Sequence, residues 1–268
     1  MKPAPFDYVA PTSLEEALEL RARHAGECAV LAGGQSLVPS LNLRLARPAV
    51  VIDVNGIAEL RGIRAVERTT TIGATTRQRA AERDPNAGPL LREALSYVAH
   101  PAIRTRGTIG GSVAHADPAA ELPAVVVLHD GAIVARSTRG ERTIAAADFF
   151  TGWLTNALEP DELLVEVRLP PLPPGCGTAF LELSRRHGDF ALVGVAAMAA
   201  PGDVRVALTG VDGAPVLRRF DEDSTEIGRE VAASLDPPGD MHATGAYRRR
   251  VAAVLVDRAL AQARSRAA

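Results

Sequence analysis

Apolar residues in the first 55 positions recur with a helical period and then gather into short runs. Ser13-Leu14-Glu15-Glu16 has the spacing of a capping box, and the apolar face that follows it predicts an amphipathic helix ending near Gly26. The runs at residues 28–31 and 50–53 are too short for helices and predict strands, with a short helix over residues 37–45 between them. Residues 1 to about 55 are therefore predicted to form a small α/β unit in which a glycine turn links strand to helix.

Further strands and helices are predicted up to residue 169, after which a group of prolines interrupts the pattern of apolar residues. We predict strands at residues 70–73, 133–135 and 163–169, and helices at residues 89–98 and 119–128. The crowded positions Pro170, Pro171, Pro173, Pro174 and Gly175 are incompatible with a helix and indicate a linker. Beyond it we predict a separate α+β domain, with strands at residues 178–185, 191–200 and 204–209 and helices at about 224–235 and 243–266.

The composition fits a globular protein and narrows the choice of partners. A chain of 268 residues that is 47% hydrophobic can bury two or three packed units. Its net charge of -2 gives no overall field to attract a polyanion, so nucleic acid is not an expected partner. The sequence lacks both a signal-peptide core and an apolar run of about 18 residues, which predicts a soluble, cytoplasmic protein without a transmembrane segment.

Two double-glycine turns, Gly33-Gly34 and Gly110-Gly111, are the main candidates for chemistry, and we interpret each as following a strand-like run. A glycine turn lets backbone N–H groups approach a phosphate, and a helix that begins there adds positive potential. One such turn is typical of an ordinary tight turn, whereas two together favour a nucleotide cofactor. A Cβ at Gly33 or Gly111 is expected to obstruct the phosphate more than it disturbs the fold.

Signatures of other chemistries are missing from the sequence. It contains no G-x-G-x-x-G and no G-x-x-x-x-G-K-[ST], so a phosphate group would be held in another way. It also lacks H-E-x-x-H, G-x-S-x-G and any Cys/His cluster, and Cys28 and Cys176 alone cannot provide the four ligands of an iron–sulfur cluster. Single histidines are interpreted as surface or hydrogen-bonding residues. No catalytic residue and no metal ligand are assigned from the sequence.

Four ordered motifs carry a resemblance to a known family. They are Ala32-Gly33-Gly34-Gln35-Ser36-Leu37, residues 104–112 (RTRGTIGGS), residues 115–121 (HADPAAE) and residues 185–191 (RRHGDFA). With these motifs the sequence resembles the FAD-binding subunits of molybdenum hydroxylases. This family includes the medium subunit of aerobic carbon monoxide dehydrogenase and the flavin domain of xanthine dehydrogenase. The resemblance covers nearly the whole chain.

The resemblance implies an α+β protein with a vanillyl-alcohol-oxidase (PCMH-type) FAD-binding fold. Two α/β subdomains would clasp an extended FAD, and a C-terminal α+β domain like that of carbon monoxide dehydrogenase flavoproteins would close over the flavin. The expected limits are residues 1–173 for the FAD-binding domain, with subdomains of about 1–55 and 56–173, and residues 178–268 for the C-terminal domain.

The resemblance also implies which residues contact FAD. Residues 32–36 and 108–112 would contact the pyrophosphate, Glu121 would lie near the ribityl or pyrophosphate region, and Leu164 would pack on the isoalloxazine. The alternatives are a solvated helix residue for Glu121 and a core strand leucine for Leu164. The full set of expected FAD-binding residues is Leu31, Ala32, Gly33, Gly34, Gln35, Ser36, Leu37, Thr108, Ile109, Gly110, Gly111, Ser112, Glu121 and Leu164.

One position departs from the family pattern. Several relatives carry a lysine on the strand before the arginine-containing loop, where this chain has Phe180-Leu181-Glu182-Leu183. A lysine contact to the flavin therefore does not carry over. The effect of Leu181 and Glu182 on the flavin's redox potential and acceptor preference stays open.

The function that the resemblance implies is electron transfer within an oxidoreductase complex. Substrate would be oxidised on a large molybdopterin subunit, electrons would cross two [2Fe-2S] clusters in a small subunit, and non-covalent FAD in this chain would pass them to an external acceptor. The complex would be a dimer of heterotrimers. A quinone, oxygen, NAD and a carrier protein all remain open as acceptors, and the substrate is undetermined. The alternatives are a standalone FAD-dependent oxidoreductase and a non-catalytic FAD-binding module.

Overall fold

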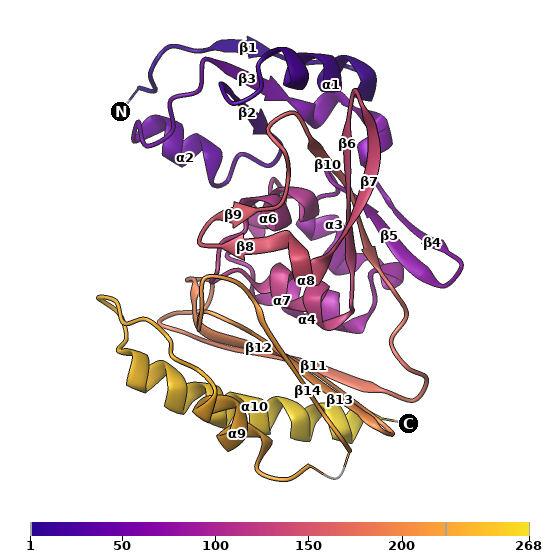
Figure 1. Ribbon diagram of the computed structural model, residues 1–268, viewed down its shortest axis with the longest axis vertical. Helices are drawn as coiled ribbons and strands as arrows, with labels where there is room; N and C mark the ends of the chain where they lie inside the picture. Colours follow the sequence, from indigo (N-terminus) through magenta and orange to yellow (C-terminus); the bar gives the residue numbers. More distant parts are fainter. Residues whose placement is uncertain (1, 223, 268) are drawn as a thin grey trace.

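The computed structural model describes residues 2–222 and 224–267. The predicted domain limits at residues 1 and 268 fall outside the described residues. Three sheets follow one another along the long axis of the molecule, with the N-terminal sheet at one end, the C-terminal sheet at the other, and a group of helices between the second and third sheets (Figure 1). The fold contains both helices and sheets, as the α+β assignment expects.

The N-terminal sheet is parallel, in the order β1-β3-β2. Its strands are β1 (Asp7–Val9), β2 (Cys28–Leu31) and β3 (Val50–Asp53), and its helices are α1 (Leu14–Arg23) and α2 (Leu37–Asn42). The predicted cap of α1 is confirmed, because the Ser13 hydroxyl accepts a hydrogen bond of 3.2 Å from the Glu16 N–H. The predicted extension of α2 to residue 45 is wrong, since Arg44 adopts a positive φ of 58° that ends the helical path.

The middle sheet is antiparallel, in the order β4-β5-β10-β6-β7, with a separate hairpin of β8 and β9. The strands are β4 (Ile63–Val66), β5 (Thr69–Gly73), β6 (Ala132–Ser137), β7 (Gly140–Ala145), β8 (Phe150–Gly152), β9 (Thr155–Asn156) and β10 (Leu163–Leu169). The helices are α3 (Gln78–Arg83), α4 (Pro89–Tyr97), α5 (Pro101–Arg104), α6 (Ile109–His115), α7 (Glu121–Leu128) and α8 (Ala146–Phe149). Three 3₁₀ turns, η1 (Val54–Gly56), η2 (Ala58–Leu60) and η3 (Pro85–Ala87), complete this part.

One prediction about the second glycine segment is wrong. Gly110 and Gly111 do not form a turn after a strand, because they lie in the first turn of α6 and the helix α5 precedes them. The short apolar stretch before Thr108 is helical, since Pro101 occupies the first position of α5, where its fixed φ suits a helix. The segment therefore begins a helix in which Thr108 is the N-cap residue.

The C-terminal sheet is antiparallel, in the order β11-β12-β13-β14. Its strands are β11 (Gly177–Ser184), β12 (Ala191–Ala200), β13 (Asp203–Thr209) and β14 (Val216–Phe220), and its helices are α9 (Ile227–Ala233) and α10 (Gly245–Arg266). The three predicted strands and both helices are confirmed, whereas β14 was not predicted. Residues 170–176 form neither helix nor strand, as their prolines predict. None of the helices in the described part of the chain is long and apolar enough to cross a membrane.

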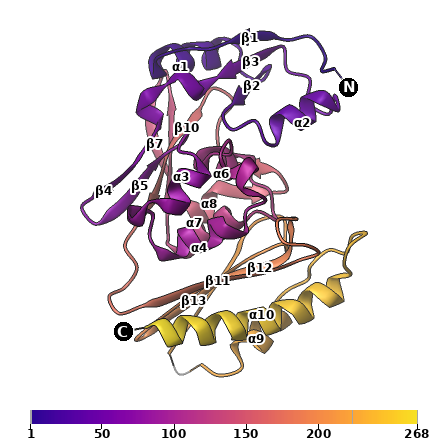
Figure 2. The same cartoon turned by 180° about the vertical axis from the view of Figure 1, so that it is seen from behind.

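The C-terminal sheet packs helices on both of its faces. Figures 1 and 2 show it between α10 on one side and the helices α4 and α7 on the other. Ala179 of β11 joins the core under α10, whereas its neighbour Phe180 joins the core of the middle part of the chain. This alternation follows from the two-residue period of a strand. The C-terminal sheet and the middle helices therefore share one apolar core.

Glu93 of α4 adds polar links to this shared core. Its carboxylate accepts a hydrogen bond of 3.0 Å from the Phe180 N–H and one of 2.9 Å from the guanidinium of Arg266, at the end of α10. The ring of Phe180 is fully buried and lies 5.4 Å from the ring of Tyr97, centroid to centroid. These contacts fix the C-terminal sheet against the region that holds the candidate site.

We expect Phe180→Ala to destabilise the protein by about 3–5 kcal/mol, because it removes a buried ring and leaves a cavity between the two parts. Phe190→Ala is the matched control, since Phe190 is 70% exposed and its truncation is expected to cost less than about 1 kcal/mol. Chemical denaturation of the ligand-free proteins measures both values. Similar losses for the two variants would contradict the shared core.

Candidate functional site

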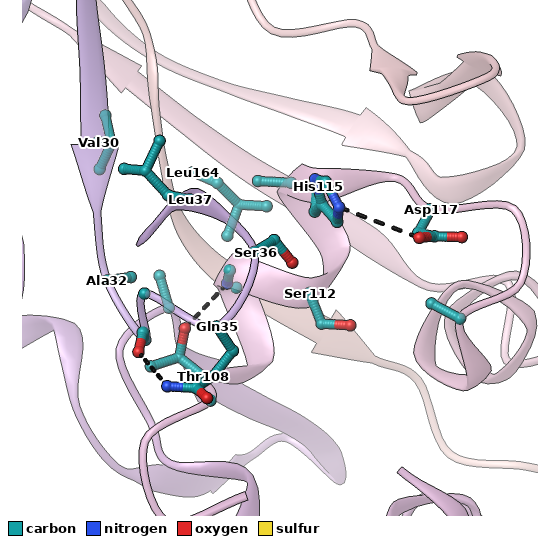
Figure 3. Close-up of a pocket in the computed structure, with 18 of the residues that line it drawn as sticks. Val30, Ala32, Gln35, Ser36, Leu37, Thr108, Ser112, His115, Asp117 and Leu164 are labelled. Carbon is teal, nitrogen blue, oxygen red and sulfur yellow. Dashed lines mark hydrogen bonds and ion pairs between the residues drawn. The ribbon is translucent and has the colours of Figure 1, made fainter. Parts of the chain in front are cut away.

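A cavity of about 770 Å³ lies where the three parts of the chain meet. Its walls come from the loop after β2, from α6, from the start of α7, from β10 and from residues 188–190 of the C-terminal part. Figure 3 shows that Ser36 from the loop after β2, Leu164 from β10, and Thr108 and Ser112 from the start of α6 lie around the same space. The structure brings all the expected site residues to this cavity except Leu31 and Ile109. Ile109 is buried in the core instead.

The loop from Ala32 to Ser36 is held from behind by Asn55. The Asn55 side-chain amide donates to the Ala32 carbonyl at 2.7 Å and to Asp53 Oδ1 at 2.6 Å, and its own oxygen accepts from Arg77 at 2.7 Å. Gly34 has a φ of +74°, a conformation that favours glycine. Sequence reasoning missed Asn55 and Arg77, since neither belongs to a glycine motif.

The first loop offers unused backbone donors. Within the described part of the chain, the N–H groups of residues 33–37 donate to no protein acceptor. Five successive N–H groups without a partner in a partly open cavity form the kind of concave donor surface that binds anions. This observation supports the expectation that the first glycine loop is an anion site.

The second glycine segment is different, because its N–H groups are already used. The Ile109 N–H donates to the Thr76 carbonyl and the Gly110 N–H to the Ala74 carbonyl, both at 2.9 Å. The Gly111 N–H donates to the Thr108 hydroxyl at 3.0 Å. The Ser112 N–H donates to the Thr108 carbonyl at 3.1 Å, within the first turn of α6. The expectation that both turns present free amides is therefore wrong for the second one. The group with which this segment can contact a ligand is the Ser112 side chain.

The glycines serve first to let the two segments touch. A Cβ at Gly33 would lie 2.8 Å from the Arg106 carbonyl oxygen and 2.8 Å from the Gly107 Cα. A Cβ at Gly111 would lie 2.6 Å from the Thr108 hydroxyl that caps α6. A Cβ at these positions therefore disturbs the fold itself, because backbone or capping atoms of the protein already occupy that space, whereas the expectation that it obstructs the phosphate still more stays a prediction.

The cavity wall carries more acidic than basic residues. Among the described residues that line it, only Arg21 and His115 can be positively charged. The guanidinium of Arg21 is engaged by the Cys28 carbonyl at 3.2 Å and by the Glu162 carbonyl at 3.3 Å. His115 Nε2 lies 4.0 Å from Asp117. The acidic residues are Asp117, Glu121, Glu159, Glu162 and Asp189.

Glu121 and Leu164 both lie in the cavity wall. Glu121 begins α7 and is only 6% exposed, so it is not a solvated helix residue. Burial raises the pKa of its carboxyl to about 7, with Asp117 acting in the same direction. Leu164 lies at an irregularity of β10, where the register against β6 shifts, and is 9% exposed. It joins the core of the middle part and lines the cavity as well.

Family models match the chain in two adjoining segments. Residues 4–172 match the FAD binding domain in molybdopterin dehydrogenase, and residues 178–263 match the CO dehydrogenase flavoprotein C-terminal domain. These matches account for the three parts that surround the cavity.

The chain is also similar over its full length to curated proteins and to solved structures. The chain is 41% identical, over all of its length and 97% of the relative, to the 6-hydroxypseudooxynicotine dehydrogenase complex subunit alpha of Paenarthrobacter nicotinovorans. It is 37% identical over the full length of both chains to the carbon monoxide dehydrogenase medium chain of Hydrogenophaga pseudoflava. A solved structure of carbon monoxide dehydrogenase from the same organism matches over the full length of both chains, with a TM-score of 0.94 and 36% identity.

We expect Gly33→Ala to destabilise the ligand-free protein by about 1–3 kcal/mol, since the new methyl group overlaps backbone atoms of the second segment. Gly239→Ala is the control, because a Cβ there would meet its nearest atom at an ordinary 3.5 Å, and we expect a change within about 0.5 kcal/mol. Thermal or denaturant unfolding without added ligand compares the two. Equal stability of both variants would contradict the close contact of the loops.

Proposed function

The chain belongs to the family of FAD-binding subunits of molybdenum hydroxylases, and we propose that it passes electrons from [2Fe-2S] clusters of a partner subunit through FAD to an external acceptor. The observation that carries this proposal is the cavity, which offers a loop of free backbone N–H groups in one wall and the apolar side chains of Leu164 and Phe190 in another. Its volume lies within the range of roughly 300–1,000 Å³ that is usual for cofactor sites.

The pyrophosphate would lie against the first loop. The free N–H groups of residues 33–37 would donate to its oxygens, and the hydroxyls of Ser36 and Ser112 would approach from the two sides. The positive end of α6 points the same way, although its first amides are occupied. Since basic side chains are few in the wall, neutral donors rather than charges would hold the anion.

The isoalloxazine would lie toward β10 and the C-terminal part. Leu164 offers an apolar surface there, and Phe190, which is 70% exposed and lines the cavity, offers another. Bound FAD would supply the exchange of one or two electrons, so this chain needs no nucleophile of its own. The task of its residues is to orient the cofactor and exclude water from it.

The partners follow from the family. The curated relatives include medium chains and complex subunits, and we propose a small [2Fe-2S] subunit and a large molybdopterin subunit as the partners of this chain. Three further expectations stay predictions. They are assembly as a dimer of heterotrimers, the limits of residues 1–173 and 178–268 for the two domains, and a cytoplasmic location. The substrate of the complex would be bound on the large subunit.

Removing either hydroxyl is expected to weaken FAD binding. We expect Ser36→Ala and Ser112→Ala each to raise the Kd for FAD roughly 10- to 100-fold, the effect of losing a hydrogen bond to a charged group worth about 1.5–3 kcal/mol. Ser265→Ala is the control, because Ser265 is exposed near the end of α10 and its hydroxyl only donates to Gln262. Fluorescence titration of the ligand-free proteins with FAD measures the effect. Unchanged affinity in both site variants would argue against a pyrophosphate between them.

The isolated chain is expected to carry FAD non-covalently and to perform only the last electron-transfer step. Acid precipitation is expected to release the yellow chromophore. In stopped-flow experiments, dithionite is expected to bleach the bound flavin, and a quinone or oxygen to restore its absorbance. Purines, carbon monoxide and other candidate substrates are expected to leave the oxidised spectrum unchanged. Bleaching by such a substrate without a partner chain would instead identify a standalone oxidoreductase.

A further inference from the structure

Exposed apolar side chains gather on α2 and on the residues that follow it. Val38 is 41% exposed, Leu43 is 58% exposed and Leu45 is 79% exposed. A single exposed apolar residue is ordinary, whereas three within eight positions of one segment are typical of a surface that binds a partner. These three residues, together with Arg44 and Arg47, are called the α2 surface below.

The two arginines give the α2 surface a positive charge. The Nε of Arg44 donates to the Lys2 carbonyl at 3.2 Å, and the Nε of Arg47 donates to the Arg44 carbonyl at 3.0 Å. Within the described part of the chain neither arginine forms an ion pair with a carboxylate. No acidic residue lies between Glu27 and Asp53 in the sequence. The charge of the two guanidinium groups is therefore available to a partner.

The α2 surface lies beside the cofactor cavity. Leu37, Ser40 and Ala46 line the cavity, whereas the three apolar residues of the α2 surface do not. The same segment thus presents one side to the cavity and another to solvent. Figures 1 and 2 both show α2 at the margin of the molecule, with β4 at the opposite margin. A protein that covers the α2 surface would be separated from the cavity by a single short segment of chain.

We propose that the α2 surface is the docking site of the [2Fe-2S] subunit that delivers electrons to this chain. The inference rests on the proposed function, since that function names the partner. Electrons pass between protein-bound cofactors only over short distances, so the donor subunit must lie against a wall of the cofactor cavity. The α2 surface adjoins such a wall, and it combines exposed apolar area with charge.

The charge of the α2 surface fits this partner. A [2Fe-2S] centre held by cysteine thiolates is anionic, because the thiolates and sulfides together outweigh the charge of the iron ions. Opposite charges raise the rate of encounter and fix the orientation of the partners, while the apolar side chains supply the area that leaves water. A second copy of this chain fits less well, since a two-fold contact would bring the same arginines together.

Photo-crosslinking identifies the partner directly. A photoreactive amino acid replaces Leu45, the complex is assembled in the native host and irradiated, and the linked chain is identified by mass spectrometry. We expect a link to the [2Fe-2S] subunit. The same amino acid at Val66 of β4 is the matched control, because Val66 is 51% exposed and lies at the opposite margin, and we expect no such link from it. A link from position 45 to the molybdenum subunit, to a second copy of this chain or to no chain would overturn the proposal.

The apolar part is tested by combining Leu43→Ser with Leu45→Ser. We expect this double variant to bind the purified [2Fe-2S] subunit roughly tenfold or more weakly, because a few apolar anchors carry most of the free energy of an interface. Val66→Ser is the control and is expected to bind like the wild type. The thermal midpoint and the Kd for FAD are expected to stay unchanged, since both leucines are exposed and lie outside the cavity wall. Wild-type affinity in the double variant would contradict the proposal.

The charged part is tested with Arg44→Glu. Its matched control is Arg68→Glu, because both arginines are exposed and both have a positive φ, 58° for Arg44 and 69° for Arg68. At about 50 mM salt we expect Arg44→Glu to slow association with the [2Fe-2S] subunit several-fold and to reduce the salt dependence of the rate, whereas Arg68→Glu follows the wild type. Equal association rates for the two variants would contradict the charge complementarity on which the choice of partner rests.

Flavin measurements on the same samples separate this inference from the proposed function. If position 45 links to the [2Fe-2S] subunit but the chain binds no FAD, the docking site stands and the proposed function fails. If FAD binds and exchanges electrons with dithionite and a quinone, but the [2Fe-2S] subunit links only from other positions, the proposed function stands and the docking site is overturned.

Discussion

The close approach of two backbone segments, one before α2 and one before α6, is the constraint on which the cavity depends. Gly33 lies so near the Arg106 carbonyl that no side chain fits between them. This contact holds the N-terminal sheet on the middle part, and Asn55 and Arg77 reinforce it from behind through bonds to both segments. A larger residue at this point would force the two segments apart.

The second constraint is the apolar core that the C-terminal sheet shares with α4 and α7. Because β12 is buried on both of its faces, the sheet cannot leave the middle part without exposing Phe180, Met198 and their neighbours. The loop that carries Phe190 is thereby held at the cavity mouth. The wall is thus formed by segments far apart in sequence whose relative positions are set by packing.

Much of this arrangement could be predicted from the sequence, and the missing parts have physical reasons. Long runs such as residues 191–200 predicted strands, the cap at Ser13 predicted a helix, and the glycine motifs led to the cavity. The helical start at Gly110 was missed because glycine has a low helix propensity, whereas the Thr108 cap and the packing against Ala74 decide the conformation there. Asn55 could not be found, since its role depends on contacts between segments that are distant in sequence.

The scarcity of free cations in the cavity wall sets how the site responds to its medium. Attraction between a phosphate and exposed arginines or lysines weakens steeply as salt is added, because mobile ions screen it. Hydrogen bonds from the amides of residues 33–37 are short-ranged and are screened far less. A dinucleotide held in this way, as we propose, would keep its affinity across a wide range of ionic strength, so the protein would retain its cofactor when the salt concentration of its surroundings changes.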